Sequence, residues 1–146
     1  MLGLGKRKKR ILIAEDDANI RNIVRFMLEG KGYEVFAAED GKVAVENLPK
    51  FKPDLVMLDV MMPHKNGLEI CYELKNDPKT LKIPVLILTA TTQTSQKGDD
   101  YWRVRSRADD FISKPFKSAE LLARVQKLLD DLPDKPEEDA AKRFRI

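Results

Sequence analysis

Short apolar runs alternate along this chain with segments that have the apolar spacing of amphipathic helices. Several runs are apolar at consecutive positions, which is typical of strands covered by helices on both faces. The alternation therefore predicts an α/β fold built on a doubly wound parallel sheet of five strands. The expected strands span residues 10–15, 33–37, 54–59, 84–89 and 110–113, and the expected helices span 17–30, 40–48, 66–76, 95–107 and 117–130.

The ends of the expected helices have sequence signals of their own. Asp17 is a suitable N-cap for the first helix, because its carboxylate can accept hydrogen bonds from free backbone N–H groups. Asn66 and Glu69 have the spacing of a capping box. Pro49 is expected to stop the helix that begins near Asp40, since proline disfavours helical backbone at the residue before it.

The composition indicates a single domain. The 146 residues are 42% hydrophobic and 35% charged, which is typical of a globular protein with a hydrated surface. No apolar run approaches the roughly 20 residues that cross a bilayer, and the N-terminus has no secretory signal. The single cysteine, Cys71, favours a reducing compartment and is expected in the core. We therefore expect a cytoplasmic protein with no membrane span.

The net charge of +3 comes from the N-terminal end of the chain. Residues 1–10 carry five cations and no acid, whereas residues 11–130 carry 18 bases and 19 acids. We expect a basic tail at residues 1–9, a domain at 10–130 and a charged tail at 131–146. A basic arm can bind nucleic acid or anionic lipid, but a solubilising tail is the simpler interpretation.

Polar residues stand where four of the expected strands end. They are Glu15 and Asp16, Asp59, Thr89, and Lys114. The carboxyl ends of parallel strands meet at one edge of a sheet, and ligands bind there. Helix caps and solvated loop acids are the alternative explanation for the acids, but it does not explain why a threonine and a lysine stand at the same edge. We therefore expect one site.

The chemistry of this site follows from its charges. Clustered carboxylates repel one another, so a cation or a proton is needed to stabilise them. Oxygen ligands without nearby histidine or cysteine favour Mg²⁺, or Mn²⁺, over zinc. Because Mg²⁺ commonly binds carboxylates together with phosphate oxygens, the acids predict a phosphoryl group at the site. Asp59 could then attack phosphorus and form an acyl phosphate, with Lys114 and Thr89 binding the phosphoryl oxygens.

The motifs around these residues resemble the receiver domain of two-component response regulators. The resemblance covers about residues 10–130 and rests on Ile11 to Asp17, Asp59 with Met62-Pro63 and Gly67, Leu88-Thr89-Ala90, Phe111, and Ser113-Lys114-Pro115-Phe116. It implies a flavodoxin-like (βα)5 fold with the strand order 2-1-3-4-5.

The resemblance also implies the phosphoryl donor and the metal ligands. Asp59 would accept the phosphoryl group from a sensor histidine kinase or a phosphotransfer protein. Mg²⁺ would bind Glu15, Asp16, Asp59 and the backbone carbonyl of Met61.

The remaining implied roles concern the signal. Thr89 would hydrogen-bond the phosphoryl group, and Lys114 would pair with it. Phe111 would turn inward as Thr89 moves, so that a downstream protein target reads the face formed by the fourth helix, fifth strand and fifth helix. The peptide bond before Pro115 would be cis.

The segment between Thr89 and Lys114 departs from the family pattern. It is longer than usual, and Arg107 occupies a position where the family usually has glycine. Tyr101 and Trp102 either pack on the sheet or form a partner-binding patch with the neighbouring arginines, Arg103, Arg105 and Arg107.

Three functions fit these residues. The leading hypothesis is a phosphorylation-dependent switch of the stand-alone chemotaxis or phosphorelay type, without a DNA-binding domain, because only residues 131–146 follow the last helix. It would be a monomer or a phosphorylation-dependent dimer, and it would catalyse only its own phosphorylation and dephosphorylation, so it is not an enzyme in the usual sense.

One alternative is an adaptor receiver that binds partners without phosphorylation. The other is an enzyme with an aspartyl nucleophile, which is disfavoured because dehalogenase-like enzymes have a second aspartate where this chain has Met61.

Overall fold

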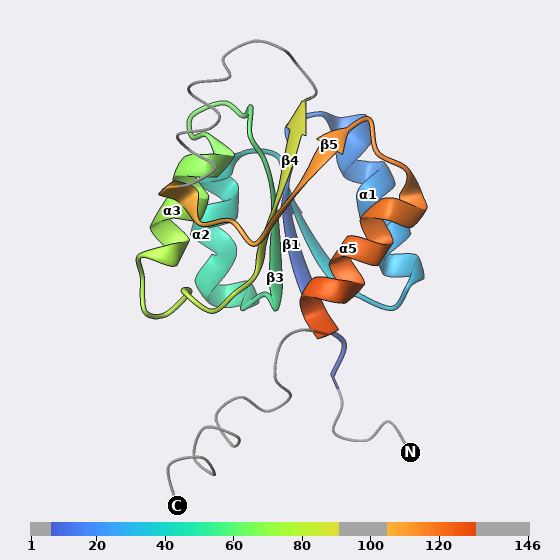
Figure 1. The fold of residues 1–146 in the computed structure, drawn as a ribbon, viewed down its shortest axis with the longest axis horizontal. Coiled ribbons are helices and arrows are strands. Elements are labelled where there is room, and N and C mark those ends of the chain that lie inside the picture. The colour runs from blue at the N-terminus through green and yellow to red at the C-terminus, as the bar shows by residue number, and fades with distance from the viewer. Residues whose placement is uncertain (1–6, 91–104, 131–146) are drawn as a thin grey trace, which may run out of the picture.

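Residues 7–90 and 105–130, the part of the chain described in a computed structural model, form one parallel sheet covered by helices on both faces (Figure 1). The five strands have the order β2-β1-β3-β4-β5, which confirms the predicted fold class and strand order. The elements are β1 Arg10–Ala14, α1 Ala18–Gly30, β2 Glu34–Ala38, α2 Gly41–Phe51, β3 Leu55–Asp59, α3 Gly67–Lys75, β4 Val85–Ala90, β5 Asp110–Lys114 and α5 Ser118–Asp130. Most of the helix expected at 95–107 lies outside the described residues, although Arg105 and Ser106 are helical.

Alternating strand residues build a separate core on each face of the sheet. Helices α1 and α5 cover one face, and α2 and α3 cover the other (Figure 1). The strand residues beneath α1 and α5 are Ile11, Ile13, Leu55, Met57, Leu86, Leu88 and Ile112. Those beneath α2 and α3 are Leu12, Ala14, Val56, Leu58, Val85 and Ile87. Burial on both faces explains why the strand sequences are apolar at consecutive positions.

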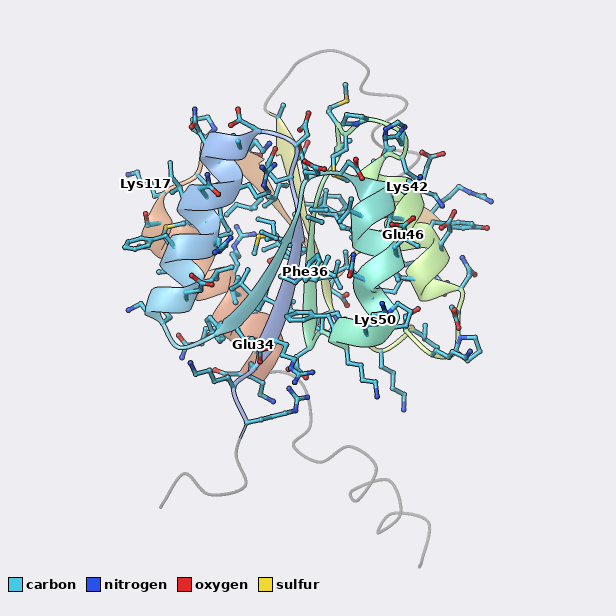
Figure 2. All side chains as sticks on the ribbon, turned by 180° about the vertical axis from the view of Figure 1, so that it is seen from behind. Glu34, Phe36, Lys42, Glu46, Lys50 and Lys117 are labelled. Atoms are coloured by element: carbon cyan, nitrogen blue, oxygen red, sulfur yellow. The ribbon has the colours of Figure 1, made fainter. Side chains whose placement is uncertain are left out.

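Helix α2 shows the amphipathic pattern that attaches a helix to a sheet. Lys42, Glu46 and Lys50 are exposed along its outer side, whereas Phe36 of β2 lies between the sheet and the helix (Figure 2). Among the described residues, no helix is both long and apolar enough to cross a membrane.

The prediction that Pro49 stops helix α2 is wrong, because the helix continues to Phe51. Pro49 is exposed, so its ring meets solvent, although the missing N–H removes one helical hydrogen bond. Phe51 is half-buried and packs against Phe36, with ring centroids 5.7 Å apart. This apolar contact favours the last helical turn. The helix ends at Lys52, whose φ of 52° is left-handed.

The other predicted helix signals are present. The Asp17 side chain accepts hydrogen bonds from the backbone N–H groups of Asn19 and Ile20, and Asn66 and Glu69 form the predicted capping box. Cys71 is fully buried, as predicted, and burial raises the pKa of its thiol to about 12.

The first described residues contact the domain. The guanidinium of Arg7, which belongs to the predicted basic tail, makes two hydrogen bonds of 3.0 Å to the carboxylate of Asp54. Asp54 also accepts a hydrogen bond of 2.7 Å from the backbone N–H of Arg10. The other predicted tail residues at 1–6 and 131–146 lie outside the described residues.

Candidate functional site

Three acids lie together at the carboxyl edge of the sheet. One carboxylate oxygen from each of Glu15, Asp16 and Asp59 lies within 4.8 Å of the other two. Glu15 has no exposed surface and Asp59 has 4% exposed, whereas Asp16 is exposed. The cluster is therefore buried on one side and open to solvent on the other.

Strand register explains why acids from two strands meet a lysine from a third. Ala14 pairs with Leu58 of β3, and Ala90 of β4 pairs with Lys114 of β5. The strands are parallel, so their carboxyl ends share one edge. With a period of two, the next side chains after Ile13, Met57 and Ile112 on the α1 and α5 face are Glu15, Asp59 and Lys114.

Lys114 lies between the two buried acids. Its Nζ atom is 2.8 Å from Oε1 of Glu15 and 3.1 Å from Oδ1 of Asp59. Burial alone would lower the pKa of Lys114, but its bonds to the two acids raise the pKa above its usual value. The ammonium therefore stays charged and offsets part of the repulsion between the carboxylates.

Burial and repulsion act most strongly on Asp59. Burial, followed by the negative charge of Glu15, raises the pKa of Asp59 from 3.8 to about 7, although Lys114 opposes the shift. Near neutral pH, protein groups alone thus stabilise the negative charge of an ionised Asp59 only in part. A bound cation would stabilise the ionised form further.

The donor set fits a hard divalent cation. The site offers carboxylate oxygens and no histidine or cysteine, which is the set that Mg²⁺ prefers. Within the described residues, buried Oε1 of Glu15 receives no hydrogen bond of standard geometry, although Lys114 Nζ makes an ion pair with it. This oxygen therefore retains acceptor capacity for a cation or a water bound to one. Met61 follows β3 by two residues, so its backbone lies near the same edge.

Thr89 of β4 and Phe111 of β5 are not members of the acidic cluster. The Thr89 hydroxyl donates to the carbonyl of its neighbour Ala90, over 3.3 Å. Phe111 is half-buried in β5, pairs with Ile87 of β4 and packs against the core beneath α2 and α3. It therefore lies on the opposite face from the one that carries the acids. The peptide bond between Lys114 and Pro115 is cis, the isomer that the resemblance implies.

Two residues support the site in ways that sequence patterns do not explain. A Cβ atom on Gly67 would lie 2.2 Å from the carbonyl oxygen of Asp59, so only glycine lets the start of α3 pack against the end of β3. Arg21 of α1 donates to the backbone carbonyl of Glu15 over 2.8 Å. Gly67 belongs to a family motif, which signals its presence but not its contact, and nothing in the sequence marks Arg21.

Arg107 takes an unusual backbone conformation. Its φ is 57°, in the left-handed region where glycine is favoured, which agrees with the glycine usual in the family at this position. Its guanidinium donates to the carbonyl of Lys75, over 2.6 Å, and to Oδ1 of Asn76, over 3.1 Å. Arg107 thus binds the end of α3. Of the other members of the predicted patch, Arg105 is exposed, whereas Tyr101, Trp102 and Arg103 lie outside the described residues.

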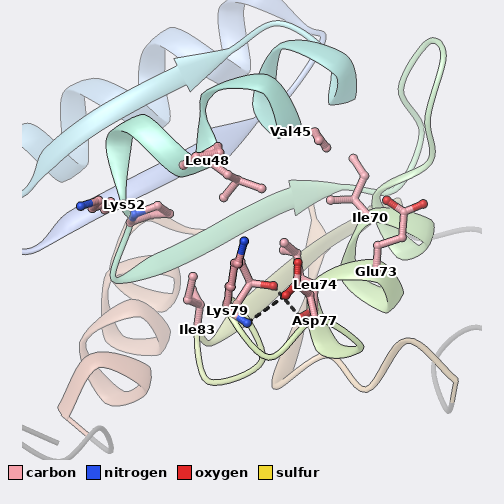
Figure 3. Close-up of a pocket in the computed structure, with 12 residues that line it drawn as sticks. Val45, Leu48, Lys52, Ile70, Glu73, Leu74, Asp77, Lys79 and Ile83 are labelled. Atoms are coloured by element: carbon pink, nitrogen blue, oxygen red, sulfur yellow. Dashed lines mark hydrogen bonds between the residues drawn. The ribbon is translucent and has the colours of Figure 1, made fainter. Parts of the chain in front are cut away.

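A cavity of about 690 Å³ lies away from the acids, between α2 and α3 (Figure 3). Its walls include Leu48, Leu74 and Ile83, and its charged lining residues are Lys52, Lys79, Glu73 and Asp77. These residues come from the ends of α2 and α3 and the segment before β4, at the amino edge of the sheet. None of the predicted site residues lines this cavity.

Comparison with known families gives the same assignment as the fold and the acids. The model of the response regulator receiver domain matches residues 11–126. The chain belongs to this family. Response regulator receivers act in two-component signalling, bind Mg²⁺ at an acidic pocket and are not enzymes in the usual sense. The acidic cluster of this receiver is formed by Glu15, Asp16 and Asp59.

Individual relatives agree with the family. The chain is 38% identical over 131 residues to the DNA-binding response regulator MtrA of Mycolicibacterium paratuberculosis, covering 90% of this chain and 56% of MtrA. It is 43% identical over 120 residues to the DNA-binding dual master transcriptional regulator RpaA of Synechocystis, covering 82% of this chain and 48% of RpaA. Among solved structures, the signal receiver domain of a histidine kinase from Syntrophus aciditrophicus matches with a TM-score of 0.79 and 35% identity, over 85% of this chain and 92% of that domain.

The prediction of a stand-alone receiver without a DNA-binding domain is contradicted by these relatives. MtrA and RpaA are named as DNA-binding regulators, and the chain spans about half the length of each. The prediction relied on the few residues after the last helix. That count describes only this chain and gives no information about the half of the relatives that it does not match.

Proposed function

We propose that this receiver is a phosphorylation-dependent signalling switch whose phosphoacceptor is Asp59. The observation that carries the proposal is the environment of the Asp59 carboxylate. It is almost fully buried, lies 3.1 Å from the Lys114 ammonium and shares the edge of the sheet with two further acids. A carboxylate with a neighbouring cation and a divalent-metal site is suited to accept a phosphoryl group.

The donor in this proposal is the phosphohistidine of a sensor histidine kinase or a phosphotransfer protein. A carboxylate oxygen of Asp59 attacks phosphorus, so that an O–P bond forms as the P–N bond of phosphohistidine breaks and the imidazole leaves. Bound Mg²⁺, held by Glu15, Asp16, Asp59 and the carbonyl of Met61, would neutralise charge on the acids and the phosphoryl oxygens. Lys114 would pair with a phosphoryl oxygen.

The signal in this proposal passes through β4 and β5. Thr89 would turn its hydroxyl from Ala90 to the phosphoryl group, and Phe111 would move into the space that Thr89 leaves. The half-buried position of Phe111 beside β4 supports such a movement. The output would be read on the face that includes β5 and α5. Because the relatives are named as DNA-binding regulators, we propose control of DNA binding as that output.

Phosphorylation by a small donor tests this proposal. The full chain is incubated with Mg²⁺ and acetyl phosphate, and the intact mass is measured. We expect a gain of one phosphoryl group that is lost in Asp59→Asn and retained in Asp77→Asn, an exposed acid away from the site. No gain in the wild type would reject the switch and favour an adaptor that works without phosphorylation. A full gain in Asp59→Asn would show that another residue accepts the phosphoryl group.

A further inference from the structure

The turn that carries two of the acids is held by an arginine of the following helix. Arg21 lies in the first turns of α1 and is half-buried. Its Nη1 atom donates to the backbone carbonyl of Glu15 over 2.8 Å and approaches that of Asp16 at 3.4 Å. Its own backbone N–H donates to the carbonyl of Asp17 over 2.9 Å. Both ends of Arg21 thus contact the turn.

Other contacts hold the same turn from different directions. The backbone N–H of Glu15 donates to the carbonyl of Ala38 in β2, over 3.1 Å. Oε2 of Glu15 accepts a hydrogen bond from the backbone N–H of Asp17, over 3.1 Å. These contacts satisfy donors of the turn, whereas Arg21 satisfies its carbonyls. Because Glu15 is fully buried, its carbonyl would otherwise lack a good partner.

We propose that Arg21 is a positioning residue for the divalent-cation site, one that holds the backbone of Glu15 and Asp16 so that their carboxylates face Asp59. The inference rests on the proposed function, in which these acids bind Mg²⁺. Mg²⁺ requires nearly ideal octahedral geometry, so looser acids bind it more weakly. Groups that orient metal ligands typically change metal affinity by about 10-fold to 100-fold when they are replaced.

The charge of Arg21 and its hydrogen bonds have opposite expected effects on Mg²⁺ affinity, so the two can be told apart by experiment. A guanidinium beside a cation site repels the cation, so removal of the charge alone would tighten Mg²⁺ binding. Loss of the two carbonyl contacts would weaken it. The sign of the change in Arg21→Met therefore separates positioning from simple charge.

The experiment measures the Mg²⁺ dissociation constant of the full chain by calorimetry. We expect about 10-fold weaker binding in Arg21→Met. We expect a smaller loss in Arg21→Lys, which keeps the charge and an ammonium that can donate to the same carbonyls. Arg25→Met is the matched control, since Arg25 lies one turn further along α1, is exposed and pairs with Glu29 rather than with the turn. It should bind Mg²⁺ like the wild type.

Thermal unfolding of each variant without metal shows whether it folds. If Arg21→Met does not fold, Mg²⁺ binding is compared between Arg21→Lys and the wild type. Mg²⁺ binding as tight as in the wild type or tighter, in Arg21→Met or in Arg21→Lys where Arg21→Met does not fold, would overturn the positioning role alone. Absence of Mg²⁺ binding in the wild type would instead overturn the proposed cation site, and the role of Arg21 with it.

Discussion

Replacing Asp59 by asparagine is expected to stabilise the metal-free protein above neutral pH. The Asp59 carboxylate is 4% exposed and lies beside Glu15, and its pKa is raised from 3.8 to about 7. Between these two pH values the folded protein holds a proton that the unfolded chain releases. Stability therefore falls as pH rises through this window. Asparagine has nearly the same shape and does not ionise, so the variant avoids this loss.

The size of the effect follows from the shift in pKa. A pKa unit corresponds to about 1.4 kcal/mol, so the shift corresponds to at most roughly 4 kcal/mol. We expect Asp59→Asn to raise the free energy of unfolding by about 2 to 4 kcal/mol near pH 8. Near pH 4 the gain should be small, because Asp59 of the folded wild type is then protonated.

Urea unfolding in the presence of a chelator, at about pH 4 and about pH 8, measures this difference. Asp16→Asn is the matched control, since it removes the same charge from an exposed member of the cluster and should change stability little at either pH. A destabilised Asp59→Asn at the higher pH, or an equal gain at both pH values, would refute the account of how burial and repulsion act on Asp59.

Substitutions at three further residues test contacts around the site and at the opposite edge of the sheet. Gly67→Ala should lower the free energy of unfolding by about 2 kcal/mol or more and slow phosphorylation, because the new Cβ would lie 2.2 Å from the carbonyl oxygen of Asp59. Urea unfolding and intact mass measure the two effects, and unchanged values would show that the backbones of α3 and β3 can separate freely. Lys75→Met should lower the free energy of unfolding, measured in urea, by about 3 kcal/mol, since the Lys75 ammonium is buried and donates to two backbone carbonyls and to Asp109. An unchanged free energy would mean that packing of the methionine replaces these bonds. Arg107→Gly should lower the free energy of unfolding by about 1 kcal/mol and Arg107→Ala by about 2 kcal/mol, because both lose the bonds to α3 but only glycine adopts the left-handed backbone without strain. A larger loss in Arg107→Gly than in Arg107→Ala would contradict this explanation.

The parts of the fold that the sequence predicts well are those with local signals. Consecutive apolar residues identify the strands, and their polar ends place Glu15, Asp59 and Lys114 at one edge. The capping box at Asn66 depends only on residues within one helical turn, and it is present. Parallel pairing then brings the strand ends together without further information.

The features that sequence patterns miss depend on contacts between distant elements. Pro49 is expected to end a helix, but packing of Phe51 on Phe36 continues the helix through it. The contact between Gly67 and the Asp59 carbonyl arises only when α3 is placed on β3. Arg21 looks like any helical arginine until the turn before it is folded. In each case the residue that makes the contact is distant in sequence or is brought close only by folding, so local periodicity does not predict it.

Locating the phosphoryl group within the chain tests whether Asp59 is the phosphoacceptor. The protein is treated with Mg²⁺ and acetyl phosphate, the acyl phosphate is reduced with borohydride, and the peptides are sequenced by mass spectrometry. Borohydride converts a phosphorylated aspartate to homoserine, so we expect homoserine at position 59 and unchanged acids at positions 15 and 16. Homoserine at another position, with Asp59 unchanged, would contradict this expectation.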